Sequence, residues 1–176
     1  MMCCFNTLST YITMYKEKIK IYLSARISKD AQTYNKKVCS QLESPIEVFL
    51  PQEHNPWNIN HKKMPKKIVD MDIQAMKESD MCLLLPDYGR DCAYEIGWYS
   101  NSQKPIVVFI EAQTEWLRDW MVKGGVNYII TNNKETYWIL KEDPILSHKK
   151  ILHIQNIQDL NTIIKKIYVQ NKKLFS

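Results

Sequence analysis

The sequence predicts an α/β fold in which one parallel sheet is covered by helices on both faces. Short apolar runs alternate along the chain with longer amphipathic stretches, the order of elements that is typical of α/β domains. The apolar runs are almost uninterrupted, so both faces of each strand are expected to be buried, as in a parallel sheet. The length of 176 residues favours one compact domain with its own core.

Five apolar runs are the predicted strands, and they cover residues 19–25, 46–50, 81–85, 105–110 and 128–131. A weaker sixth run covers residues 151–154. We therefore expect a doubly wound, flavodoxin-like sheet of five parallel strands. In such a sheet the first and third strands are neighbours, and ligands bind at the carboxyl ends of the strands.

Helices are expected between these strands, over residues 29–43, 65–79, 92–102, 114–123, 134–142 and 157–173. In the helix expected over residues 157–173, apolar residues recur at helical spacing and predict an apolar stripe that packs on the rest of the domain. No linker or repeat divides the chain after its first strand. The expected organisation is an N-terminal extension over residues 1–17 and a single domain over residues 18–176.

Composition excludes several classes of protein. Hydrophobic residues make up 45% and charged residues 24%, the profile of an ordered globular chain. No apolar run approaches the ~20 residues that cross a bilayer, and no secretory signal is evident, so no membrane association is expected. The net charge of +5 comes from lysine pairs scattered along the chain. Solvated helix faces and loops explain these pairs better than a nucleic-acid groove does.

Cysteine and glycine usage narrow the chemistry. The five cysteines are an odd number without a CxxC pair, and the four histidines do not cluster with them. Neither a disulfide framework nor a metal site is therefore expected, and a reducing, cytoplasmic compartment is the simplest interpretation. Four glycines leave no GxGxxG or GxxxxGK[ST] phosphate loop and no GxSxG elbow. No cofactor is predicted.

The exit of the first strand carries polar residues that a sheet does not need. Tyr22 lies inside the apolar run, where its hydroxyl must find a partner. Ser24 and Arg26 follow, and an arginine at this place can hold a phosphate or carboxylate by a bidentate fork. The structural alternative is a core tyrosine beside a surface arginine.

Two carboxylates lie on the helix that precedes the third strand. Asp72 is four residues after Ile68 and four before Met76, which places it on or beside the apolar stripe. A carboxylate there must be paired, hydrogen-bonded or at the edge of a cavity. Asp70 points elsewhere and is expected to be solvated. The alternative for Asp72 is a helix-edge acid that touches water.

The third strand is followed by DYGRDCAYEIGW, which opens a helix. Asp91 is the expected N-cap, and Glu95 then lies in the first turn or just beyond it. The helix dipole stabilises an acid there and keeps it ionised, as a nucleophile requires. Gly97 suggests close packing between helix and strand, since glycine inside a helix is unfavourable. A purely structural acid at the helix start is the alternative for Glu95.

These strand ends converge if the sheet is doubly wound. Because the first and third strands are neighbours, Tyr22, Asp72 and Glu95 can meet at one edge of the sheet. Two carboxylates around one sugar are the arrangement used in retaining glycosyl chemistry, where one acid attacks the anomeric carbon and the other handles the proton of the leaving group.

On these motifs the chain resembles the nucleoside 2-deoxyribosyltransferases and the related deoxynucleoside-monophosphate N-glycosidases. The resemblance spans roughly residues 20–110. It rests on KIYLSAR, on D-x-D-(x)7-D (Asp70, Asp72, Asp80) before an apolar strand, and on YEIGW followed by KPIVVFI.

The resemblance implies a role for each matching residue. Glu95 matches the nucleophile that takes the sugar onto its carboxylate, Asp72 the acid that assists the departing base, and Tyr22 the tyrosine that positions the nucleophile. Ser24 and Arg26 occupy the region that grips a 5′-phosphate in the monophosphate-hydrolysing branch. The substrate would be a small nucleoside or nucleotide, and relatives form homo-oligomers with shared sites.

The chain departs from the family pattern before the nucleophile. The family usually carries Asp or Ser six residues before the glutamate and Gly four residues before it, whereas this chain has Gly89 and Asp91 there. Asp91 or Asp87 is expected to take over the contact with the sugar.

The loop after the second strand contains Trp57, which either stacks on the base or pins the loop to the surface. A nucleotide-binding or signalling module without turnover, and an enzyme that cleaves NAD at its nicotinamide bond, remain the alternatives. An FMN carrier is disfavoured because no phosphate loop rich in Ser, Thr or Gly follows the first strand.

Overall fold

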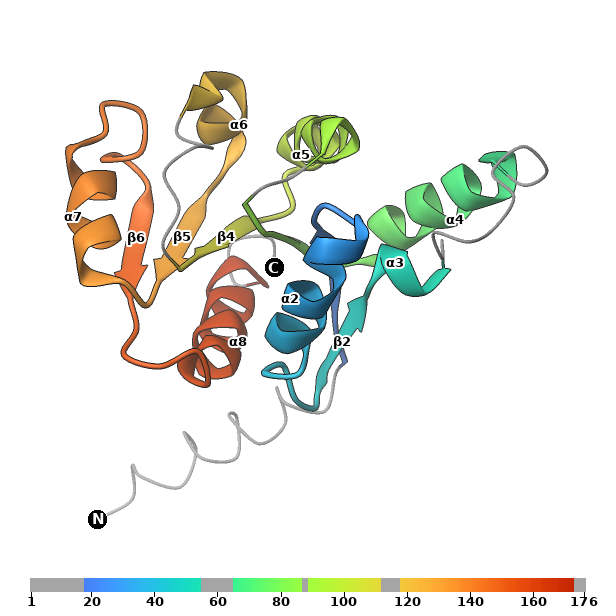
Figure 1. The fold of residues 1–176 in the computed structure, drawn as a ribbon, viewed down its shortest axis with the longest axis horizontal. Coiled ribbons are helices and arrows are strands. Elements are labelled where there is room, and N and C mark those ends of the chain that lie inside the picture. Colours follow the sequence, from blue (N-terminus) through green and yellow to red (C-terminus); the bar gives the residue numbers. More distant parts are fainter. Residues whose placement is uncertain (1–17, 55–64, 87–88, 112–117, 173–176) are drawn as a thin grey trace, which may run out of the picture.

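A computed structural model describes residues 18–54, 65–86, 89–111 and 118–172 of the chain. It shows one parallel sheet with helices on both faces (Figure 1). The strand order is β2-β1-β3-β4-β5-β6, and every neighbouring pair is parallel. The strands are β1 (Ile19–Ser24), β2 (Ile46–Phe49), β3 (Met81–Leu84), β4 (Ile106–Ile110), β5 (Tyr128–Thr131) and β6 (Lys150–His153). The α/β doubly wound prediction is confirmed.

The prediction of five strands is wrong, because the weak run near residue 151 forms a sixth. β6 pairs with β5 from Lys150 opposite Tyr128 to His153 opposite Thr131. It lies at the edge of the sheet, and only Ile151 of its four residues is buried. An edge strand needs fewer apolar residues than a central one, which is why its run is weak in the sequence.

The described helices are α2 (Lys29–Cys39), α3 (Pro51–His54), α4 (Pro65–Glu78), α5 (Arg90–Ser102), α6 (Trp120–Gly125), α7 (Lys134–Glu142) and α8 (Asp159–Lys172). The short helix α3 forms where only a loop was expected. The other six correspond to predicted helices, with ends that differ by up to six residues. Residues 112–117, where the fourth expected helix in chain order (residues 114–123) was expected to begin, lie outside the described part. None of the helices described is long and apolar enough to cross a membrane.

The helices form two layers (Figure 1). Side chains alternate between the faces of a strand, so neighbouring strand residues enter different cores. Leu23 and Leu83 pack in the core that contains α2 and α8. Tyr22 and Leu84 pack in the core that contains α4, α5, α6 and α7. Residues 22 and 24 of β1 therefore point toward α4 and α5, the helices that carry the two candidate acids.

Because the order places β1 beside β3, the first and third strands end together at the carboxyl edge. Ser24 pairs with Leu84 at the last position of both strands. The helix that follows β3 begins within a few residues of this point. The topology thus brings the three motifs that are separated in the sequence to one place.

Candidate active site

Glu95 lies at the centre of the site, held by two hydroxyl groups from β1. The Tyr22 hydroxyl donates to Glu95 Oε1 at 2.7 Å, and the Ser24 hydroxyl donates to Oε2 at 2.6 Å. Both donors are fully buried, and they are two residues apart, which puts them on one face of the strand. Each carboxylate oxygen thus has its own donor, and the orientation of the carboxylate is fixed.

The surroundings act on the charge of Glu95 in two directions. Burial is the largest influence and raises the pKa of Glu95, while the hydrogen bonds from Ser24 and Tyr22 oppose this by favouring the ionised form. The nearby charge of Asp91 also raises the pKa. The helix dipole was expected to favour the ionised form of Glu95, and the two β1 hydroxyls add hydrogen bonds that act in the same direction.

Asp72 reaches the same place from α4. Its Oδ1 atom is buried and has no hydrogen-bond partner among the residues described. Burial first, and then the charges of Glu95 and Asp91, raise the pKa of Asp72 to about 6. A carboxyl with this pKa is able to hold a proton near neutral pH and release it to a leaving group.

Asp72 and Glu95 line one cavity of about 590 Å³ at the carboxyl edge of the sheet. Arg26 and Asp91 line it too, and both are exposed to solvent. Its apolar wall comes largely from α4, through Ile68, Val69, Ile73 and Met76. The cavity therefore combines partly buried acids, an apolar wall and one exposed arginine among its described lining residues. Its volume is within the range of small-molecule sites.

Residues 18–113, more than half of the chain, match the sequence model of a protein family. This family is described as nucleoside 2-deoxyribosyltransferase like. The chain belongs to this family. The matched range contains Tyr22, Asp72 and Glu95.

Two solved structures are similar to the chain. A conserved protein from Enterococcus faecalis V583 has 20% sequence identity and a TM-score of 0.54, over 85% of this chain and 99% of that one. At this identity the likeness supports the fold. A 2-deoxyribosyltransferase from the psychrotolerant bacterium Bacillus psychrosaccharolyticus has 20% identity and a TM-score of 0.49, over 62% of this chain and 84% of that one. The search of curated proteins gave no match.

The family motif D-x-D-(x)7-D separates into three roles in the structure. Asp72 faces the cavity. Asp70 is exposed and forms an ion pair with Lys66 at 2.6 Å, so it is solvated as expected. Asp80 accepts a hydrogen bond from the backbone N–H of Lys20 at 2.8 Å. The last aspartate of the motif therefore fastens the start of β3 to β1.

Ser24 and Asp91 are placed differently from the sequence expectation. Ser24 was expected to contact substrate, but its side chain is fully buried and bonded to Glu95. Asp91 was expected to be the N-cap of α5, but Gly89 is the N-cap and Asp91 lies in the first turn. An acid in the first turn is favourable beside the helix dipole, so α5 can begin before it. Asp87 and Trp57 lie outside the described residues.

The interpretation of Gly97 was wrong. A Cβ atom added there would have no neighbour within 4 Å among the described atoms. Close packing of α5 instead needs Gly125 of α6, where a Cβ atom would come within 2.5 Å of Ser100 Oγ and 3.2 Å of Ile96 Cγ2. Gly125 was not predicted to make this contact, because the residues around it in the sequence do not indicate which helix packs against it.

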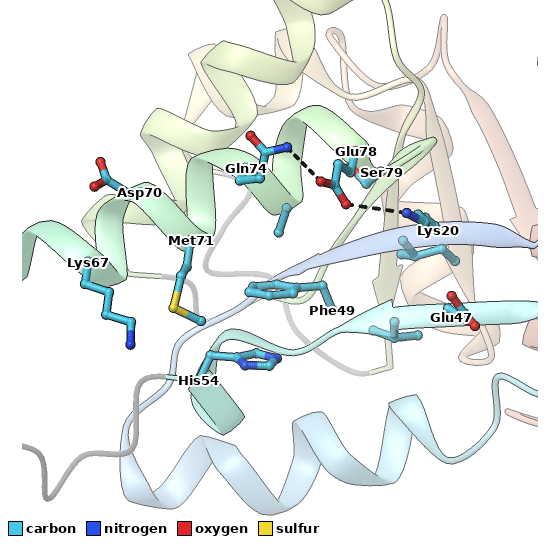
Figure 2. A pocket seen from close by; sticks show the side chains of 13 residues that line it. Lys20, Glu47, Phe49, His54, Lys67, Asp70, Met71, Gln74, Glu78 and Ser79 are labelled. Atoms are coloured by element: carbon cyan, nitrogen blue, oxygen red, sulfur yellow. Dashed lines mark hydrogen bonds and ion pairs between the residues drawn. The ribbon is translucent and has the colours of Figure 1, made fainter.

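A second hollow of about 540 Å³ lies on another side of α4, above β1 and β2 (Figure 2). Its acids are engaged: Glu78 accepts hydrogen bonds from Gln74 at 2.7 Å and from Lys20 at 3.4 Å, and these lower the pKa of Glu78. Phe49, which lines this hollow, stacks on His54 with ring centroids 4.5 Å apart. It also stacks on Tyr22, with ring centroids 5.6 Å apart. This hollow has no acid comparable to Asp72 or Glu95, and we assign the chemistry to the other cavity.

Proposed function

We propose that the protein cleaves or transfers at the N-glycosidic bond of a nucleoside or deoxynucleoside, or of its 5′-monophosphate, with Glu95 as the nucleophile. The observation that carries this proposal is the pair of carboxyl groups in one cavity. Burial raises the pKa of both acids, but Glu95 has two hydroxyl donors that favour its charged form, whereas Asp72 has no such donor among the described residues. Membership of the nucleoside 2-deoxyribosyltransferase-like family supports the same chemistry.

The reaction begins with attack of a Glu95 carboxylate oxygen on the anomeric carbon of the sugar. The C–N bond breaks, its electron pair moves to the nitrogen of the base, and Asp72 donates a proton to the base. The product of this step is a glycosyl ester on Glu95. Water or a second base then attacks the anomeric carbon, transfers its proton to Asp72 and regenerates the carboxylate.

The remaining contacts follow from the lining of the cavity. Arg26 is its one described cation and is proposed to bind a 5′-phosphate when the substrate has one. Asp91 is proposed to accept hydrogen bonds from sugar hydroxyls. We also propose that Asp87 contacts the sugar and that Trp57 stacks on the base. A homo-oligomeric assembly and a cytoplasmic location are proposed from the family resemblance and from the cysteine usage.

The test is a panel of nucleosides, deoxynucleosides and their 5′-monophosphates, incubated with the protein with and without a second free base. Chromatography separates hydrolysis, which releases free base alone, from transfer, which produces an exchanged nucleoside. Mass spectrometry of protein denatured during turnover should detect a pentosyl group on Glu95. The Glu95→Gln variant should lose at least about a thousandfold in kcat.

Glu78→Gln is the matched control, because this glutamate lies on α4 in the second hollow and should not affect turnover. If no substrate yields free base or exchanged nucleoside, or if Glu95→Gln is as active as the wild type, the proposal fails. Thermal stabilisation by nucleotides without any product would instead identify a binding module. Release of nicotinamide from NAD would identify a dinucleotide-cleaving enzyme.

A further inference from the structure

Two large apolar side chains are exposed at the mouth of the active-site cavity. Tyr94 of α5 is 63% exposed, Val69 of α4 is 53% exposed, and both line the cavity. Scattered apolar residues on a surface are ordinary, and exposed Trp138 of α7 is one that does not line this cavity. Tyr94 and Val69 differ because they belong to the two helices that carry the two acids.

The positions of these side chains follow from helix geometry. Val69 is three residues before Asp72, so both lie on one side of α4, about one turn apart. Tyr94 directly precedes Glu95 on α5, and it lines the cavity although most of it is exposed. The apolar pair therefore shares one cavity with both acids, and both members of the pair are exposed to solvent.

The proposed chemistry decides which part of a substrate comes here. The sugar must contact Glu95, and the base must come within reach of the proton on Asp72. Val69 and Ile68 of α4 also line the cavity, and helix spacing places them within about one turn of Asp72. A planar base in this position has apolar faces that aromatic and aliphatic side chains can cover.

We propose that Tyr94 and Val69 hold the leaving base by its faces, which makes Tyr94 a specificity-determining residue for planar aromatic leaving groups. This inference rests on the function proposed above. Recognition by stacking is tolerant of base identity, so the contribution of Tyr94 to binding is expected with purine and with pyrimidine bases.

The experiment measures binding in a Glu95→Gln background, where substrate is not consumed. Isothermal titration with deoxyadenosine and with thymidine should show about tenfold weaker binding after an added Tyr94→Ala change. An added Tyr94→Phe change, which keeps the ring, should stay within twofold of the background. A Val69→Ser change should weaken binding in the same direction. Free deoxyribose, which has no base, should bind equally to all these variants.

Trp138→Ala in the same background is the control, because Trp138 is 57% exposed and lies away from the cavity lining. It should not alter nucleoside binding. The inference is overturned if Tyr94→Ala binds nucleosides as the background does, if it weakens deoxyribose to the same extent, or if only one class of base responds. These results leave the proposed function intact, whereas failure of the wild type to release base from any substrate removes the proposed function itself.

Discussion

Asp143 and Asp72 are both partly buried, but in the described part of the chain only Asp143 of the two forms a salt bridge. Lys123 Nζ lies 2.5 Å from Asp143, and their side chains are 4% and 10% exposed. Burial acts to raise the pKa of Asp143, but hydrogen bonds from Lys123 and from the backbone of Leu146 and Ile145 outweigh it and lower the pKa. This acid is arranged to be charged and to join α6 to the end of α7.

Asp72 has the opposite surroundings. The charges that act on it come from Glu95 and Asp91, both negative, and together with burial they raise its pKa to about 6. No salt bridge to Asp72 is present in the described part of the chain. The fold therefore balances the charge of one partly buried acid, Asp143, with a lysine where that acid joins two helices. Asp72 has no such cation among the described residues, which fits the proposal that it holds and releases a proton.

The largest expected effect distinguishes Asp72 from Asp70, two residues away on α4. Asp72→Asn should lower kcat/KM by about 10² to 10⁴, because the base loses its proton donor. Asp70→Asn, which removes only an exposed ion pair with Lys66, should remain within about twofold. In the wild type, kcat/KM should fall as pH rises through about 6, since Asp72 then loses its proton. Steady-state kinetics over pH should show that Asp72→Asn lacks this decline.

For Asp143 we expect the reverse: loss of its cation should lower stability and leave turnover unchanged. Lys123→Met leaves Asp143 enclosed without its cation, and loss of one partner of a buried pair costs about 3 kcal/mol of stability. Chemical denaturation should measure this decrease in the free energy of unfolding, while kcat of the folded protein stays unchanged. A large loss of kcat at temperatures where the variant is folded would contradict the separation of the two acids.

A smaller effect is expected when one donor to Glu95 is removed. Tyr22→Phe deletes the hydroxyl that favours the charged form, so the pKa of Glu95 should rise further and the acidic limb of kcat/KM should move to higher pH. A hydrogen bond to a charged group is worth about 1.5 kcal/mol, which corresponds to about tenfold in rate on that limb. Tyr99→Phe is the matched control, because Tyr99 contacts Ser79 instead, and its pH profile should not move.

The smallest effect is on stability. The pKa of Asp72 is raised in the folded state, so its full contribution is present below the unfolded pKa and is lost as pH rises through about 6. Asp72→Asn does not titrate. Since Asp72 is partly solvated, screening by water reduces the effect, and the variant should be more stable by about 1 kcal/mol near pH 7.5. Denaturation at low pH should show no difference, and a variant destabilised at pH 7.5 would refute this account.

Much of the fold was predictable, because apolar runs and helical periods are local properties of the sequence. The five strong strands and the positions of six helices came from these patterns. The sixth strand gave only a weak apolar run that was not counted in the sheet, and the short helix α3 was not predicted, since an edge strand and a four-residue helix have weak local signals. The N-cap of α5 was misplaced because Gly89 and Asp91 both suit a helix start.

For the site, residue types identified Tyr22, Asp72 and Glu95, and the doubly wound order explained how they could meet. The second donor to Glu95 was assigned to substrate instead, because burial of Ser24 cannot be read from a strand end. Tyr94 was not singled out at all, although its place beside Glu95 was a signal. Whether such a side chain is exposed at a cavity depends on where α4 packs.

The sequence by itself determined which residues form strands and helices and which carboxylates interrupt the apolar pattern, because each of these depends on neighbours within a few positions. Only the tertiary structure decided that Glu95 has two buried hydroxyl donors, that Asp72 has acids and no cation beside it in the described chain, and that Asp143 has Lys123. Those partners come from elements far apart in the sequence, and the pKa of a carboxyl depends on what surrounds it in space.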